Sequence, residues 1–116
     1  METFKKFNKR SVKVGTQQYE QAIKLLSFLG IPCIIAEGEA EALCVGLCKA
    51  GLVDAVASSD LDCVAYGAPI FIRNLATDKE CIQVKYEEVL AGMEMTREEF
   101  IDLCILLGCD YVPTIP

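Results

Sequence analysis

Short, continuously apolar runs alternate along this chain with segments of helical periodicity, and this alternation limits the possible folds more than any other feature. The apolar runs cover residues 31–36, 53–58 and 69–73, and a shorter run at 81–84 is typical of an edge strand. Strands that are apolar at every position are buried on both faces, as in parallel sheets covered by helices. The pattern therefore predicts a single α/β unit built on a parallel sheet with helices on both sides.

Two of the intervening segments have the three-and-four spacing of apolar residues that favours a helix. The first covers residues 17–29, with Thr16 as a candidate N-cap and Gly30 as a closing residue. The second covers residues 39–50 and ends at Gly51. Capping residues at one end and glycine at the other are the expected boundaries of helices.

The last helix has the clearest sequence signal. Thr96 and Glu99 have the spacing of a capping box, and residues 100–107 that follow are almost wholly apolar. A helix that is apolar on nearly all sides is usually buried. We therefore expect a core helix at residues 97–107 whose buried side chains include Phe100, Ile101, Cys104 and Leu107.

Basic side chains are concentrated at the N-terminus. The whole chain has a net charge of −6, which argues against a nucleic-acid-binding surface over its full extent. The first 13 residues, however, contain one acid, Glu2, and five basic side chains: Lys5, Lys6, Lys9, Arg10 and Lys13. This arm suits contacts with phosphate groups. A solvated terminal tail is the other interpretation.

Composition excludes several classes of protein. No apolar run approaches the roughly 18 residues needed to cross a membrane, and the N-terminus lacks the apolar stretch of a secretory signal. The chain has no histidine, and its seven cysteines form no Cys-x-x-Cys pair, which rules out the usual mixed zinc sites. Cys44 and Cys48 are better explained as buried reduced thiols than as a shared metal site. We therefore expect a soluble intracellular protein in a reducing compartment.

Acidic residues gather where such a sheet would place a ligand site, beyond the carboxyl ends of its strands. They follow the first strand, the second strand and the last helix, at Glu37, Glu39, Glu41, Asp60, Asp62 and Asp110. Carboxylates that are brought together repel one another and require a cation. Because the donors are all oxygens, Mg²⁺ or Mn²⁺ is the expected ion. The other interpretation is that these acids merely complement helix N-termini.

Three motifs resemble, in order and spacing, the internal conserved block of flap endonucleases and of their exonuclease, Holliday-junction resolvase and excision-repair relatives. These motifs are Ala36-Glu-Gly-Glu-Ala-Glu-Ala42, Ser59-Asp-Leu-Asp62 and Phe100-Ile-Asp-Leu-Cys-Ile-Leu-Leu-Gly-Cys-Asp-Tyr111. The resemblance extends over residues 7–112. Segments 9–14 and 29–32 are similar to the flap endonuclease branch in particular.

The resemblance implies the three-layer, PIN-like α/β fold of these nucleases, in which a parallel sheet lies between helices, here as a partial domain. It implies hydrolysis of DNA phosphodiesters at 5′ flaps in replication and repair, with two Mg²⁺ ions as cofactors and Mn²⁺ as a substitute. It also implies a nuclear location if the source is eukaryotic. Glu37 stands where the family usually has proline, so it is not counted as a ligand. Carried over by position, the catalytic metal-binding acids are Glu39, Glu41, Asp60, Asp62 and Asp110.

Segments that surround this block in the family have no counterpart in the sequence. These are the first strand with its further aspartates, most of the helical arch, the C-terminal helical DNA-binding element and the tail that binds the sliding clamp. We therefore expect residues 1–116 to be a single partial nuclease domain. Its expected partner is flapped or branched duplex DNA, and its expected activity alone is weak or absent.

Two other functions stay open at this point. A catalytically silent fragment of the same fold could bind DNA or a partner. The segment Asp60-Leu-Asp-Cys-Val64 also resembles the haloacid dehalogenase signature, in which Asp60 would be a phosphoryl-accepting nucleophile. That phosphatase class also needs a catalytic lysine downstream and a late pair of acids, whereas Asp110 stands alone.

Overall fold

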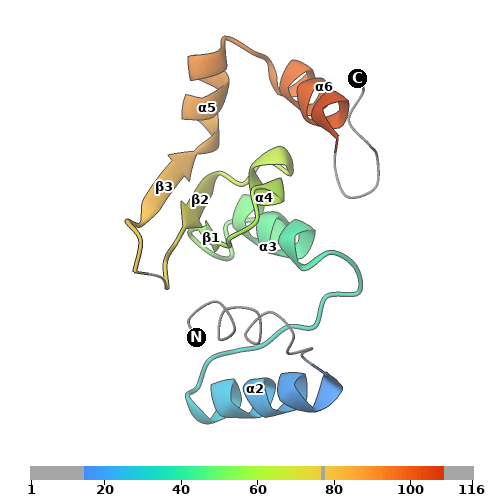
Figure 1. Ribbon diagram of the computed structural model, residues 1–116, viewed down its shortest axis with the longest axis vertical. Coiled ribbons are helices and arrows are strands. Elements are labelled where there is room, and N and C mark those ends of the chain that lie inside the picture. Colours follow the sequence, from blue (N-terminus) through green and yellow to red (C-terminus); the bar gives the residue numbers. More distant parts are fainter. Residues whose placement is uncertain (1–14, 77, 109–116) are drawn as a thin grey trace, which may run out of the picture. The chain divides into compact units, whose positions relative to one another are not determined.

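The computed structural model of the chain describes residues 15–76 and 78–108. It divides into two compact units, Met1–Ile35 and Ala36–Pro116 (Figure 1). The basic arm at residues 5–13 and Asp110 lie outside the described residues. Over the described ranges, no helix is both long and apolar enough to span a membrane. The expectation that residues 1–116 form one partial nuclease domain stays a prediction.

The first unit contains the helix α2 (Thr16–Phe28), which confirms the helix predicted at residues 17–29. Its N-cap is Gly15 rather than Thr16, and the Gly15 backbone N–H donates a 3.0 Å hydrogen bond to the side-chain oxygen of Gln18. Gly30 follows the helix with a φ of +71°, a conformation that glycine adopts at little steric cost. No residue of α2 is buried.

The first predicted strand is not formed. Residues 31–36 have no β structure, and the side chains of Ile34 and Ile35 are 67% and 81% exposed. A strand is held by ladder hydrogen bonds to a neighbour, and the sheet found in the described ranges does not include this segment. The apolar run indicated the right composition for a strand, but the prediction of a paired strand is wrong here.

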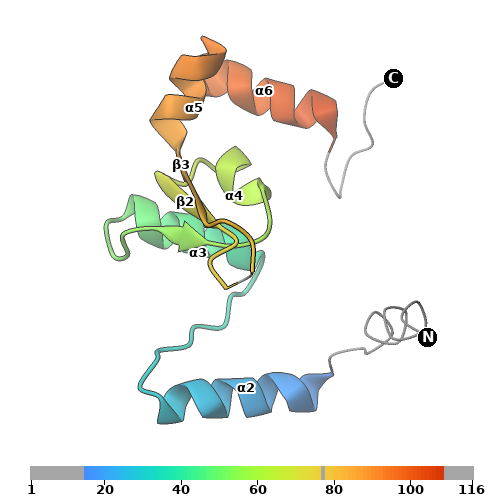
Figure 2. The ribbon, with the colours of Figure 1, turned by 60° about the vertical axis from the view of Figure 1, so that its left-hand side comes forward.

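The second unit combines a small sheet with helices (Figure 2). Its elements are α3 (Ala40–Lys49), β1 (Val56–Ala57), α4 (Asp62–Ala65), β2 (Ile70–Arg73), β3 (Ile82–Lys85), α5 (Tyr86–Met93) and α6 (Arg97–Leu107). Helices α3 and α6 and all three strands fall within, or within one residue of, predicted segments. The short helix α4 and helix α5 were not predicted.

The sheet is mixed rather than wholly parallel. Its strand order is β1-β2-β3. Strands β1 and β2 run parallel, with Val56 opposite Phe71, whereas β2 and β3 run antiparallel, with Phe71 opposite Val84. The chain can return directly after β2 because the connecting loop is closed by a 3.2 Å hydrogen bond from the Asn74 side-chain amide to the Glu80 carbonyl. The prediction of a parallel sheet therefore holds only for the β1–β2 pair.

The core of the second unit lies where α3 and α4 meet the sheet. Phe71, in the middle strand, and Cys63, in α4, are both 0% exposed. They pack in one cluster with Val45, Cys48, Val56 and Ala68, against which Val64 and Val84 also lie. This cluster fixes α3, α4 and β1 against one another, and these three elements carry or precede the candidate acids.

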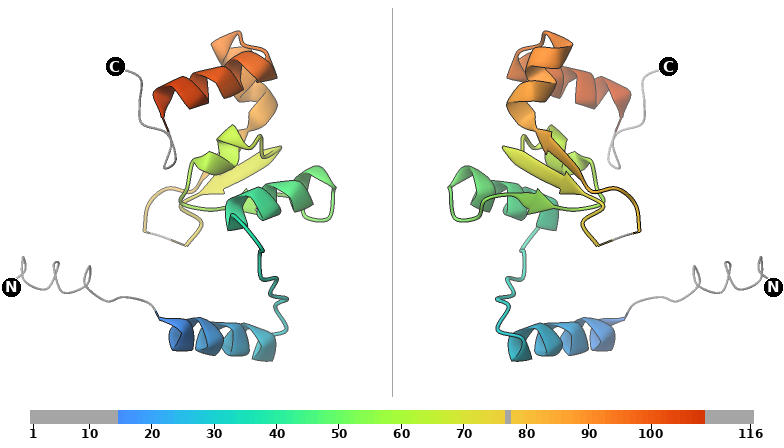
Figure 3. Two further views of the ribbon diagram at one scale, coloured as in Figure 1. Left: turned by 90° about the vertical axis from the view of Figure 1, so that its right-hand side faces the viewer. Right: turned by 90° about the vertical axis from the view of Figure 1, so that its left-hand side faces the viewer.

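Helices α5 and α6 follow β3 directly (Figure 3). The capping box predicted for α6 is present, because the Thr96 hydroxyl accepts from the Glu99 N–H and the Glu99 carboxylate accepts from the Thr96 N–H. Phe100 is buried, and its ring meets that of Tyr86 edge-on at 5.8 Å. Ile101 and Cys104 are half-buried. Leu107 was expected in the core but is 62% exposed, and its neighbours Ile105 and Leu106 are 55% and 52% exposed.

Candidate functional site

Two candidate acids lie at the start of α3. Glu39 is the N-cap residue, with extended backbone angles, and Glu41 lies in the first helical turn. Glu39 is exposed and Glu41 is half-buried. The positive end of the helix dipole favours carboxylates at these positions. The extended backbone at Glu39 gives it a different direction from that of a residue within the helix, as two acids two residues apart require if both serve one site.

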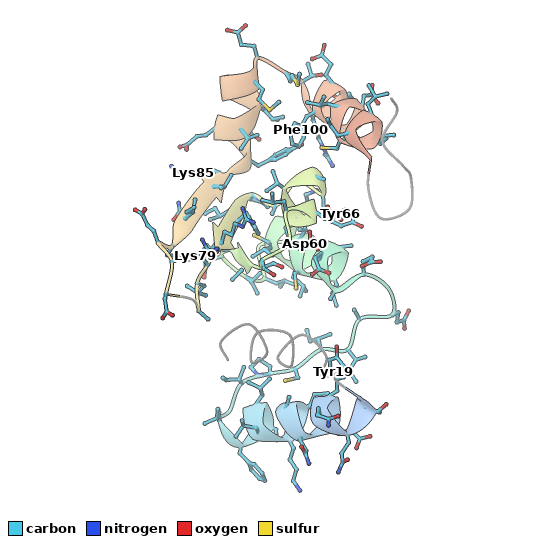
Figure 4. The ribbon with its side chains drawn as sticks, viewed as in Figure 1. Tyr19, Asp60, Tyr66, Lys79, Lys85 and Phe100 are labelled. Carbon is cyan, nitrogen blue, oxygen red and sulfur yellow. The ribbon has the colours of Figure 1, made fainter. Side chains whose placement is uncertain are left out.

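The other two described candidates lie in the turn between β1 and α4. The Asp60 N–H donates a 3.1 Å hydrogen bond to the Ser58 hydroxyl, and the Asp60 carboxylate accepts a 3.0 Å hydrogen bond from the Asp62 N–H. Asp62 is the first residue of α4. Asp60 and Asp62 are both exposed, and Asp60 is labelled in Figure 4. The turn therefore holds the backbone of both residues while their side chains remain open to water.

The buried thiol of Cys63 relates the two pairs of acids to each other. Burial raises the pKa of this thiol, a hydrogen bond with the Ser58 side chain lowers it, and the charges of Glu41 and Asp60 raise it further. Glu41 lies in the first turn of α3 and Asp60 lies two residues before α4, and these two helices pack against each other.

The charge of Asp62 also affects a thiol in a third element, helix α6. Burial raises the pKa of the Cys104 thiol in α6, and the charge of Asp62 raises it further. Helix α4 packs against both α3 and α6. The acids of the turn thus lie between the helix that carries Glu41 and the helix that precedes Asp110 in sequence.

The donor chemistry of these residues fits a hard divalent cation, since carboxylate oxygens are the ligands that Mg²⁺ and Mn²⁺ prefer. Among the described residues, however, no three acids or thiols come close enough together to hold one ion. Mg²⁺ keeps several of its own waters, so two carboxylates can suffice as direct protein ligands. That Glu39, Glu41, Asp60, Asp62 and Asp110 converge on one site stays a prediction.

Sequence reasoning missed two residues that organise this region. Ser58 accepts a hydrogen bond from the backbone two residues ahead, a turn typical of serine, and its position just before the aspartates was the available signal. Lys49, in the last turn of α3, donates a 2.5 Å hydrogen bond to the backbone carbonyl of Tyr66 at the end of α4. No local sequence pattern connects these two positions.

Comparisons with known proteins show the family to which the chain belongs. A family described as the XPG I-region matches residues 30–110. Flap endonuclease 1 of Ostreococcus lucimarinus is 48% identical over 118 residues, which cover 98% of this chain and 30% of that protein. Flap endonuclease 1 of Candida dubliniensis is 48% identical over 114 residues, covering 95% of this chain and 31% of the relative. The chain thus spans about a third of the length of these relatives.

Solved structures give the same result. The flap endonuclease-1 of Methanococcus jannaschii superposes with a TM-score of 0.82 at 35% identity, over 97% of this chain and 37% of that one. The catalytic core of Rad2 in complex with a DNA substrate also gives a TM-score of 0.82, at 30% identity, over 98% of this chain and 36% of that one. These likenesses confirm the nuclease-type α/β fold class. The chain therefore belongs to the flap endonuclease family and carries its XPG I-region.

Proposed function

We propose that this chain is the I-region of a structure-specific DNA endonuclease and 5′ exonuclease that hydrolyses phosphodiesters at 5′ flaps. The observation that carries the proposal is that Glu41 in the first turn of α3 and Asp60 just before α4 belong to two helices that pack against each other. The named relatives are flap endonucleases, and the Rad2 core was solved with a DNA substrate. Both facts support a role in DNA replication and repair, which in a eukaryote takes place in the nucleus.

The proposed cofactor is Mg²⁺, two ions in the complete site, with Mn²⁺ as a substitute. Bound there, the ions would supply Lewis acidity and an activated water for phosphodiester hydrolysis. The acids proposed to hold them are Glu39, Glu41, Asp60, Asp62 and Asp110. The hydrogen bonds of the turn hold the backbone of Asp60 and Asp62, so their carboxylates meet a cation from a fixed direction.

The proposed partner is flapped or branched duplex DNA. The described body of the chain is acidic, so phosphate contacts are assigned to the basic arm of Lys5, Lys6, Lys9, Arg10 and Lys13. Such contacts would recognise the DNA backbone and its shape rather than its base sequence. Contact with a sliding clamp is proposed only for a longer protein that includes the family's clamp-binding tail.

A catalytically silent, DNA-binding role is the second candidate. It is favoured by the observation that no three described acids already lie close enough to hold a metal ion. The phosphatase alternative is not favoured, because the relatives are nucleases and the acids of α3 would have no role in it.

Metal binding by the purified chain separates these candidates. Ions that bind only the folded state raise its melting temperature by mass action, so Mn²⁺ and Mg²⁺ should raise the melting temperature of the parent chain. Asp60→Asn and Asp62→Asn should remove that rise. Asp54→Asn, which removes one exposed acid at the other end of β1, is the matched control and should respond to metal like the parent. An equal response in all four proteins would place any metal site elsewhere.

DNA binding and cleavage then test the substrate. The chain should bind a 5′-flapped duplex more tightly than a linear duplex, with affinity that falls steeply as salt rises. Cleavage of the flap in Mg²⁺ should be weak and should disappear in Asp60→Asn, which also controls for a contaminating nuclease. Efficient turnover at moderate salt that the variant abolishes would contradict the expectation of weak activity. Absence of any preference for flapped DNA would contradict the proposed substrate.

A further inference from the structure

Lys49 connects the C-terminal ends of helices α3 and α4. It lies in the last turn of α3, and its ammonium group donates a 2.5 Å hydrogen bond to the backbone carbonyl of Tyr66, the C-cap residue of α4, which is labelled in Figure 4. A cation in this position complements the negative end of the helix dipole.

The helices α3 and α4 pack against each other. At their N-terminal ends, Glu41 lies in the first turn of α3 and Asp60 lies two residues before α4. At the other end, Lys49 reaches Tyr66. The distance between Glu41 in α3 and Asp60 before α4 thus depends on how α4 is fixed against α3.

Helix α4 needs such external support. It has only four residues, Asp62–Ala65, and a single helical turn is not stable by itself. Its buried contact is Cys63, at its second residue. The hydrogen bond from Lys49 is a side-chain contact that joins its C-terminal end to α3.

Lys49 is exposed, but its ammonium group lies close to Gly67. Gly67 has a φ of +79°, and a Cβ placed there would lie 3.3 Å from the Lys49 nitrogen and 3.4 Å from Cζ of Tyr86. The ammonium group is thus packed beside Gly67 and the Tyr86 ring. Partial burial, and after it the charge of Arg97, lowers the pKa of Lys49, as expected of an amine partly withdrawn from water.

We propose that Lys49 is a positioning residue, which sets the separation of Glu41 from Asp60 and Asp62 by tying the C-terminal end of α4 to that of α3. This inference rests on the proposed function of these acids as ligands of a divalent ion. Lys49 itself takes no part in binding the ion or the DNA.

The sign of the effect on Mn²⁺ affinity tests the proposal. Removing a cation from the chain would, by electrostatics alone, leave Mn²⁺ binding unchanged or make it tighter. Losing the tie between α3 and α4 would make it weaker. Lys49→Met keeps the length of the side chain but removes both charge and donor, and it should weaken Mn²⁺ binding by about fivefold, the factor that corresponds to the net effect of one ordinary hydrogen bond.

Three control variants of the full chain complete the measurement, with free Mn²⁺ followed by electron paramagnetic resonance. Lys49→Arg retains charge and donor and should restore most of the affinity. Lys85→Met removes a lysine whose partner is Glu88 on the exposed surface, and it reports the effect of charge alone. Ala91→Gly, at an exposed position of α5, lowers stability without touching α3 or α4, and it should leave Mn²⁺ affinity unchanged.

The outcomes separate the two proposals. A parent chain that binds no Mn²⁺ would overturn the proposed metal site, and the positioning role would fail with it. A parent chain that binds Mn²⁺, together with a Lys49→Met variant that binds it equally or more tightly, would overturn the positioning role alone. Weaker binding in Lys49→Met that is also seen in Ala91→Gly would show a loss of general stability and would equally overturn it.

Discussion

The carboxylate of Asp60 accepts a 3.0 Å hydrogen bond from the backbone N–H of Asp62. This bond shapes the turn that leads from β1 into α4, as an aspartate does when it pairs with the backbone two residues ahead. Asp60 therefore has a structural role in addition to its proposed role as a ligand. Substitutions at this position must separate the two roles.

Asp60→Ala should lower the free energy of unfolding by about 1 kcal/mol without metal, the usual effect of losing a side-chain oxygen that caps backbone N–H groups. Asp60→Asn keeps an acceptor oxygen in the same place and should unfold like the parent. Urea unfolding of the three proteins in the presence of a chelator measures the difference. Equal stability of the alanine and asparagine variants would mean that the turn does not depend on this hydrogen bond.

The sequence was sufficient for elements whose signals are local. The capping box of Thr96 and Glu99 placed α6 correctly, because both of its partners lie within one turn. The spacing of apolar residues placed α2 and α3 for the same reason. Helix α4 has only a single turn, too short for apolar spacing to indicate it, and α5 begins directly at the end of β3 without a glycine or proline to mark the boundary.

Features that depend on distant pairing could not be read from the sequence. An apolar run in the sequence does not indicate which strand will pair with it. The antiparallel direction of β3 could therefore not be predicted, and residues 31–36 were wrongly expected to pair in a sheet. Glu41 and Asp60 could be placed at element ends, but the packing of α3 against α4 could not be predicted. The hydrogen bond between Lys49 and Tyr66 joins residues 17 positions apart in different helices, and no sequence rule predicts it.

Phe100 is the anchor that fixes α6 to α5. It is 7% exposed, and its ring packs edge-on against that of Tyr86 at 5.8 Å. Phe100→Ala should therefore lower the free energy of unfolding by about 3–5 kcal/mol, enough to unfold many domains of this size. Ile105→Ala, on an exposed face of the same helix, is the control and should have a much smaller effect. If Phe100→Ala lowered the free energy of unfolding by much less than about 1 kcal/mol, the contact between Phe100 and Tyr86 would not be needed for stability.

The capping box of α6 should make stability depend on pH in the acid range. Hydrogen bonds from the Thr96 backbone N–H and hydroxyl lower the pKa of Glu99. Because the folded-state pKa lies below the unfolded value of about 4.3, this contribution is fully present above that pH and is lost as the pH falls through the folded-state pKa. Thr96→Ala should destabilise the chain by about 1 kcal/mol at pH 7, and the difference from the parent should shrink by pH 3. Thr96→Ser, which keeps the hydroxyl, should follow the parent at both pH values.

The hydroxyl of Tyr86 is buried and has no hydrogen-bond partner within the described part of the chain. The ring itself is well packed against Phe100 and lies beside Gly67. A buried hydroxyl without a partner costs free energy, because folding removes its hydrogen bonds to water without replacing them. Burial accordingly raises the pKa of Tyr86; the charge of Arg97 lowers it, and the charges of Cys104, Glu87 and Glu98 raise it.

Tyr86→Phe should therefore leave the free energy of unfolding at pH 7 unchanged or raise it by up to about 2 kcal/mol. The folded-state pKa of the phenol lies above its unfolded value of about 10, so the phenol ionises first in the unfolded state, and the parent loses stability as the pH rises above about 10 and through the folded-state pKa. Between pH 9 and 11, the free energy of unfolding should fall less for Tyr86→Phe than for the parent. Urea unfolding under reducing conditions measures this difference. Tyr19→Phe, on the exposed face of α2, should reproduce the parent's pH profile. A Tyr86→Phe variant less stable than the parent at pH 7 would show that the hydroxyl does have a partner.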